Sequence, residues 1–102
     1  MSQQPAFEAL AEAERLLVEA ESDPAAARAA ALAALRSLLL EWGATPRAET
    51  VAGLLEQAAE TDSTLAHYHP EAEVLDRLNP QPDAAERAKV FVDAARARMA
   101  NI

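Results

Sequence analysis

The fold is decided by residues 23–43, whose sequence is DPAAARAAALAALRSLLLEWG. Asp23 is a favoured N-cap residue and Pro24 suits the first helical position, so a helix is predicted to begin here. Gly43 follows as a left-handed stop. Between these signals, large apolar residues recur at helical spacing, and these are Leu32, Leu35, Leu38, Leu39 and Trp42. We expect this stripe to be the centre of the core, with Leu40 lying off it.

Two further helices are expected on either side of this stretch. The first spans residues 5–21, and its predicted buried face holds Phe7, Leu10, Leu17 and Val18. A connector at residues 43–47 follows the long helix, with Thr45 as a candidate cap for a third helix over residues 47–60. The predicted buried residues of this third helix are Val51, Leu54, Leu55 and Ala58.

Prolines divide the last third of the chain. A fourth helix is predicted over residues 63–78, and Pro70 either kinks it or opens a helix that follows a short turn. Residues 79–83, NPQPD, are expected to form a loop because two prolines flanking one residue exclude regular helix. Asp83 and Glu86 resemble a capping box for a fifth helix. The apolar face of that helix comprises Ala88, Phe91, Val92, Ala95 and Met99.

Composition agrees with these local signals. The 102 residues include 27 alanines and 13 leucines but only four aromatic residues, a mixture that favours helix over strand. We therefore expect a single all-α domain over residues 1–102, an up-and-down helical bundle of about five helices. Because alanine dominates, the helices should approach one another closely.

Charge and the scarcity of certain residues exclude several functions. The acidic chain has a formal net charge of −8, which opposes direct binding to nucleic acid or to an anionic membrane surface. There is no cysteine for a disulfide or a thiolate metal site, and two glycines are too few for a phosphate-binding loop. No apolar stretch approaches the roughly 20 residues of a membrane span, and the first residues do not resemble a signal peptide. A cytoplasmic location is expected.

From residue 30 onward, the order of features resembles the HEPN superfamily of small helical domains. Residues 30–43 are similar to that family's long second helix, and residues 45–55, TPRAETVAGLL, to its connector and third helix. Residues 71–78, EAEVLDRL, and the proline-rich loop stand where the family has a fourth helix and the loop before an alanine-rich last helix. The resemblance implies a homodimer that supports a protein partner, such as a nucleotidyltransferase in a toxin–antitoxin or nucleotide-handling pair.

The resemblance also implies a catalytically degenerate member. Nucleases of this superfamily carry an arginine followed four to six residues later by a histidine. The two histidines here are His67 and His69, and no arginine occupies residues 60–64. We expect no catalytic residue and no cofactor.

One polar cluster, residues 66–73 with the sequence AHYHPEAE, carries candidate chemistry. On a helix, a spacing of four would bring His67 to Glu71 and His69 to Glu73, but too few ligands converge to predict a metal. The candidate ligand or partner contacts are His67, Tyr68, His69, Asp76 and Arg77. For the last two, a surface ion pair is the simpler interpretation.

Three functions remain open at this point. The first is the HEPN-like partner module, whose dimer interface we place on the first and fifth helices. The second is a small-molecule or metal-binding bundle that uses the cluster from His67 to Glu73. The third is a structural adaptor without a ligand.

Overall fold

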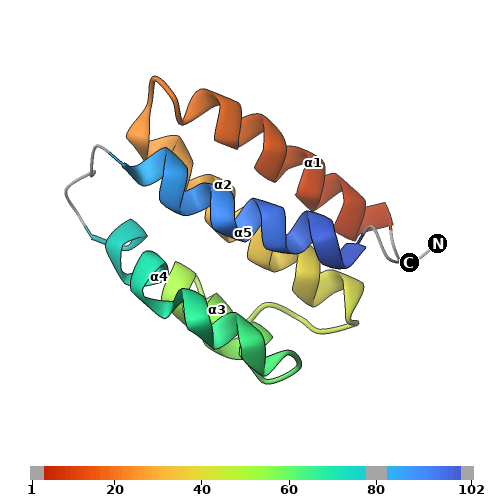
Figure 1. Ribbon diagram of the computed structural model, residues 1–102. Coiled ribbons are helices and arrows are strands. Elements are labelled where there is room, and N and C mark those ends of the chain that lie inside the picture. The colour runs from red at the N-terminus through yellow and green to blue at the C-terminus, as the bar shows by residue number, and fades with distance from the viewer. Residues whose placement is uncertain (1–3, 78–82, 100–102) are drawn as a thin grey trace.

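A computed structural model describes residues 4–77 and 83–99 (Figure 1). Over these residues the chain is helical and contains no strand, which confirms the all-α bundle. The predicted loop at residues 79–83 lies outside the described residues except for Asp83. The elements are α1 (Gln4–Glu19), α2 (Pro24–Glu41), α3 (Val51–Ala59), the 3-10 helix η1 (Ser63–Tyr68), α4 (His69–Leu75) and α5 (Ala84–Met99).

Helix α2 is the centre of the bundle. It packs against α1, α5 and α3, and Figure 1 shows α1 on one side of the α2–α5 pair and the α3–α4 segment on the other. The expected ends are confirmed: Asp23 caps the first turn by accepting a hydrogen bond from the Ala25 N–H at 3.1 Å, and Gly43 has a φ of 74°. The predicted leucines are buried and Leu40 is partly exposed, as expected, whereas Trp42, which was expected in the buried stripe, is only partly buried.

Helix α1 presents a different face to the core from the one predicted. Leu10 is buried as expected, but the exposed fractions of Phe7 and Val18 are 46% and 70%. The expectation that these two are buried is wrong. Small residues at seven-residue intervals contact the rest of the core: Ala6 and Ala13 lie on α1, and Ala20 directly follows it.

The physical reason for this rotation is the alanine-rich surface of α2. Ala27, Ala30, Ala31 and Ala34 are fully buried there, and small side chains on both helices let the two backbones approach closely. A phenylalanine pointed at α2 would hold α1 further away and leave voids beside it. Close packing of many alanines therefore sets the rotation of α1, and Phe7 and Val18 turn outward.

Helix α3 begins four residues later than predicted, because its connector is held by other bonds. The Gln57 side chain donates to the carbonyl of Thr45 at 2.8 Å and accepts from the N–H of Arg47 at 2.9 Å. Thr50, rather than Thr45, is the cap, and its hydroxyl accepts from the N–H of Gly53 at 3.0 Å. The predicted buried face is confirmed for Val51, Leu54, Leu55 and Ala58.

The segment around Pro70 is broken rather than kinked. The 3-10 helix η1 comes first, capped by Asp62, and Pro70 then occupies the first turn of α4, where its missing N–H costs nothing. Helix α4 ends at Leu75, earlier than the predicted residue 78. In α5 the expected buried face is confirmed for Ala88, Phe91, Val92, Ala95 and Met99.

Candidate functional site

Asp76, one of the candidate contact residues, is a structural carboxylate. Its Oδ1 accepts from the N–H of Val51 at 2.9 Å and from Arg28 Nε at 3.1 Å, and its Oδ2 accepts from the N–H of Ala52 at 2.9 Å. Only 19% of the side chain is exposed. Asp76 therefore ties the end of α4 to α2 and to the start of α3. Asp76 does form an ion pair, but with Arg28 of α2 and at a largely buried position, so it differs from the surface pair expected for Asp76 and Arg77; Arg77 is exposed.

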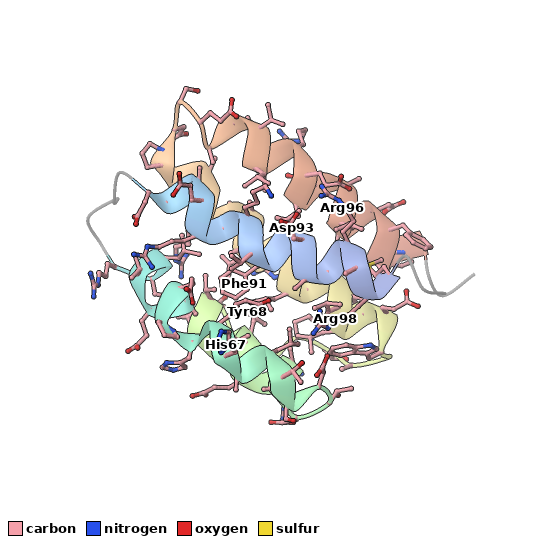
Figure 2. All side chains as sticks on the ribbon, viewed as in Figure 1. His67, Tyr68, Phe91, Asp93, Arg96 and Arg98 are labelled. Carbon is pink, nitrogen blue, oxygen red and sulfur yellow. The ribbon has the colours of Figure 1, made fainter. Side chains whose placement is uncertain are left out.

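Tyr68 is also largely structural, because its ring packs against the core. It makes an edge-on contact with Phe91 of α5, with ring centroids 5.9 Å apart, and a second one with His67 at 5.7 Å. Figure 2 shows Tyr68 between these two rings. The half-buried tyrosine thus packs η1 against α5. His67 is exposed.

His69 and Glu73 form the pair that their spacing on a helix predicts. His69 Nδ1 lies 3.2 Å from Glu73 Oε1 along α4. His67 and Glu71 do not share one continuous helix, because η1 ends between them at Tyr68. Among the residues that the structure describes, no three His, Asp or Glu side chains gather as metal ligands.

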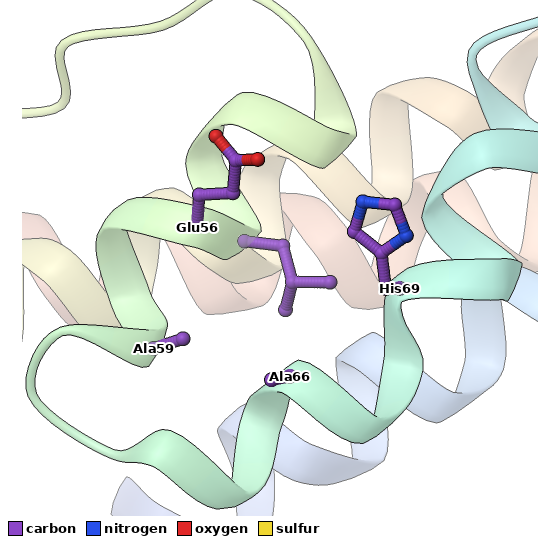
Figure 3. A pocket seen from close by; sticks show the side chains of 5 residues that line it. Glu56, Ala59, Ala66 and His69 are labelled. Carbon is purple, nitrogen blue, oxygen red and sulfur yellow. The ribbon is translucent and has the colours of Figure 1, made fainter.

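His69 also borders a depression between α3 and the junction of η1 with α4. The depression has a volume of about 400 Å³, and its lining residues are Leu55, Glu56, Ala59, Ala66 and His69. Figure 3 shows the Glu56 and His69 side chains flanking it, with Ala59 and Ala66 across from them. Sequence reasoning missed Glu56, since no spacing rule relates it to a histidine on another helix.

A second surface feature is the outward side of α1, which we call the α1 stripe: Phe7, Ala11, Glu14 and Val18. Its apolar members are exposed, and Glu14 forms an ion pair with Arg96 of α5 at 2.8 Å. Arg96 also pairs with Asp93, and Figure 2 shows both residues on α5. The end of the stripe at Val18 borders a shallow groove of about 260 Å³ between α1 and α5. Of its members, Phe7 and Val18 were expected in the core from the sequence.

The end of α5 is held to the start of η1 by a charged cluster. Asp62 accepts a hydrogen bond from the Thr64 hydroxyl at 2.6 Å and pairs with Arg98 Nε at 2.8 Å. These two interactions, the first being the larger, lower the pKa of Asp62 below its ordinary value of 3.8. Both partners stabilise the ionised carboxylate, so the cluster is strongest when Asp62 is charged.

No protein-family model, curated protein or solved structure matches the chain. The resemblance to the HEPN superfamily accordingly rests only on the sequence runs that carry it. Within residues 4–77 and 83–99, no helix combines the length and apolarity that crossing a bilayer requires. The fold is thus an all-α bundle with two candidate sites: the exposed α1 stripe and the depression beside His69.

Proposed function

We propose that the chain is a non-catalytic, cytoplasmic helical module that pairs with a second copy through the α1 stripe and supports a partner protein. One observation carries the proposal. Phe7 and Val18 are the exposed large hydrophobic residues of the described chain, and both lie on this stripe. Exposed apolar residues that share one helix face are typical of an interaction surface.

The geometry of the stripe favours a second copy as the occupant. Its members are spaced by four, three and four residues, which is the seam spacing of two paired helices. If two copies of α1 pair antiparallel about a twofold axis, Phe7 of each copy lies beside Val18 of the other. Ala11 then lies beside Glu14. The same surface patch thus serves both partners, as an isologous interface requires.

Charges beside the stripe support the same arrangement. Glu8 and Arg15 follow Phe7 and Glu14 directly, so an antiparallel pair brings Glu8 of each copy toward Arg15 of the other, which also pairs with Glu12 and Glu19 of its own helix. Opposite charges at such flanking positions favour pairing and set its orientation. Glu14, in the middle of the stripe, pairs with Arg96, which it shares with Asp93. These contacts offset part of the negative charge that two copies of α1 bring together.

The role of supporting a partner comes from the HEPN resemblance. That resemblance names a nucleotidyltransferase, in a toxin–antitoxin or nucleotide-handling pair, as the kind of partner. Pairing through α1 leaves the α3–α4 side of the bundle available for such a protein, because the two lie on opposite sides of the α2–α5 pair (Figure 1). Co-purification of a nucleotidyltransferase with the tagged chain would support this part of the proposal.

The experiment is a comparison of molar mass between the native chain and two charge variants. Val18→Glu places a carboxylate in the proposed seam at a site that is already exposed, so the fold should be retained. Ala25→Glu makes the same change at the exposed start of α2 and serves as control. Light scattering should show Val18→Glu as a monomer and Ala25→Glu as a dimer. A dimeric Val18→Glu variant would refute pairing through this stripe.

A second candidate function is the binding of a small molecule at the cluster from His67 to Glu73. It is favoured by the depression beside His69, which joins an apolar floor to two polar side chains. Pockets that bind small molecules commonly have this composition. If no small molecule binds in this depression, the third hypothesis, a structural adaptor without a ligand, is favoured instead.

A further inference from the structure

The depression beside His69 has the size and lining of a small binding site. Its volume of about 400 Å³ lies within the range of about 300–1,000 Å³ typical of ligand pockets. Leu55, Ala59 and Ala66 give it apolar walls, which would cover a small hydrocarbon or aromatic body. Glu56 and His69 are its polar lining residues, so these two decide which ligand head group fits.

Both polar residues offer hydrogen-bond acceptors. A carboxylate such as Glu56 accepts and does not donate. His69 Nδ1 lies 3.2 Å from the Glu73 carboxylate, which can only accept, and this contact favours the tautomer with the ring proton on Nδ1. In the neutral imidazole the lone pair is then on Nε2. The lining thus presents a carboxylate and an imidazole acceptor, and it contains no lysine or arginine.

The charge around the depression further limits the class of ligand that fits. The chain carries a net charge of −8, and Glu56 adds a local negative charge beside the apolar walls. An anion would be repelled, and a neutral apolar molecule would leave both acceptors unused. A metal ion is also a poor occupant, because no three suitable side chains converge among the described residues.

We propose that this depression binds a compact organic cation, an ammonium group carried on a small apolar or aromatic body. The ammonium donates to Glu56 and His69 while the body covers Leu55, Ala59 and Ala66. Glu73 acts as a positioning residue, because it fixes which nitrogen of His69 can accept. The proposal rests on the second candidate function above and names its ligand class. It is independent of pairing through α1.

Benzylamine, which is an ammonium ion at neutral pH, is the probe for a direct test. Titration into the labelled native chain, followed by NMR, should produce saturable shifts at the amides of Leu55, Ala59 and Ala66. Benzyl alcohol, a neutral molecule of the same shape, should bind about tenfold more weakly because it lacks the charge-assisted hydrogen bond. Benzoate should bind more weakly still.

Three variants test whether benzylamine binds in this depression. Glu56→Gln removes the charge with little change of shape and should weaken benzylamine binding about tenfold. Glu60→Gln makes the same change one turn along the chain at an exposed residue outside the lining, and it should leave binding unchanged. Ala66→Leu fills the depression from an exposed position and should abolish binding while circular dichroism stays the same.

The possible failures are distinguishable. If benzyl alcohol or benzoate binds at these residues as tightly as benzylamine, the ligand class is wrong although the depression is a binding site. Equal weakening of benzylamine binding by Glu56→Gln and Glu60→Gln would also refute the proposal, because the loss of affinity would then come from the change in net charge. If none of the three probes gives saturable shifts there, both the ligand class and the second candidate function fail.

Discussion

Asp76 and Arg28 stand 48 positions apart in the sequence and form an ion pair, with Arg28 Nε 3.1 Å from Asp76 Oδ1. The same carboxylate accepts the N–H groups of Val51 and Ala52, the first two residues of α3. Thr50 accepts from the next N–H, that of Gly53. The N–H groups at the start of α3 that have no partner within the helix are therefore satisfied by one local cap and by the carboxylate of Asp76, the residue that follows α4.

Replacement of Asp76 by alanine should lower the free energy of unfolding by about 2–3 kcal/mol, because it leaves two N–H groups and one guanidinium without their acceptor. Urea denaturation measures the change. The control is Glu60→Gln, which breaks the exposed Arg47–Glu60 pair and should cost less than about 0.5 kcal/mol. If the two variants cost the same, Asp76 does not hold the three helices together.

The leucines of α2 should carry much of the stability. Alanine at Leu35, Leu38 or Leu39 should cost about 2–5 kcal/mol each, because these side chains are almost completely buried and leave a cavity when shortened. Leu40→Ala is the matched control on the same helix. Because Leu40 is partly exposed, this variant should lose the least free energy of unfolding. Chemical denaturation that ranks Leu40→Ala as the most damaging would mean that the core of α2 is misassigned.

The contrast between α2 and α1 shows which parts of this fold the sequence could predict. For α2, the cap, the stop and the leucine spacing all indicate one helix position, and the structure agrees. For α1, counting large apolar residues selects Phe7 and Val18 for the core, whereas the structure buries Ala6 and Ala13. Hydrophobicity patterns weight side chains by size, but a bundle of alanine-rich helices is stabilised by close backbone approach.

The candidate site was predicted only where its residues share a helix. The His69–Glu73 pair follows from a spacing of four, and the structure contains it. The role of Asp76 depends on where the start of α3 lies, and the depression depends on Glu56 being opposite His69 across two elements. Such relationships arise from the packing of helices, and no local pattern in a single sequence encodes them.

Acid should weaken the bundle partly through Asp62. Thr64 and Arg98 lower its pKa in the folded state, so its stabilising contribution is present above about pH 4 and is lost as the pH falls through the folded pKa. The free energy of unfolding of the native chain should therefore fall more steeply in acid than that of Asp62→Asn. Thr64→Val should give an intermediate slope. Parallel pH profiles for all three would contradict this account.

The purified chain should not cleave RNA. The arginine–histidine spacing of the HEPN nucleases is missing, and the net charge of −8 opposes the approach of a phosphate backbone. Incubation with end-labelled RNA, followed by gel electrophoresis, measures this. Cleavage that persists through purification and disappears in His67→Ala or His69→Ala would show an active site in the cluster at residues 66–73.

Pairing through the α1 stripe is the central claim, and the molar mass of the native chain tests it most directly. Sedimentation equilibrium at micromolar concentration should give about twice the 10.9 kDa mass of one chain, because two copies cover Phe7 and Val18. The measured mass should approach that of a single chain on dilution. A mass of 10.9 kDa at every accessible concentration would contradict the claim.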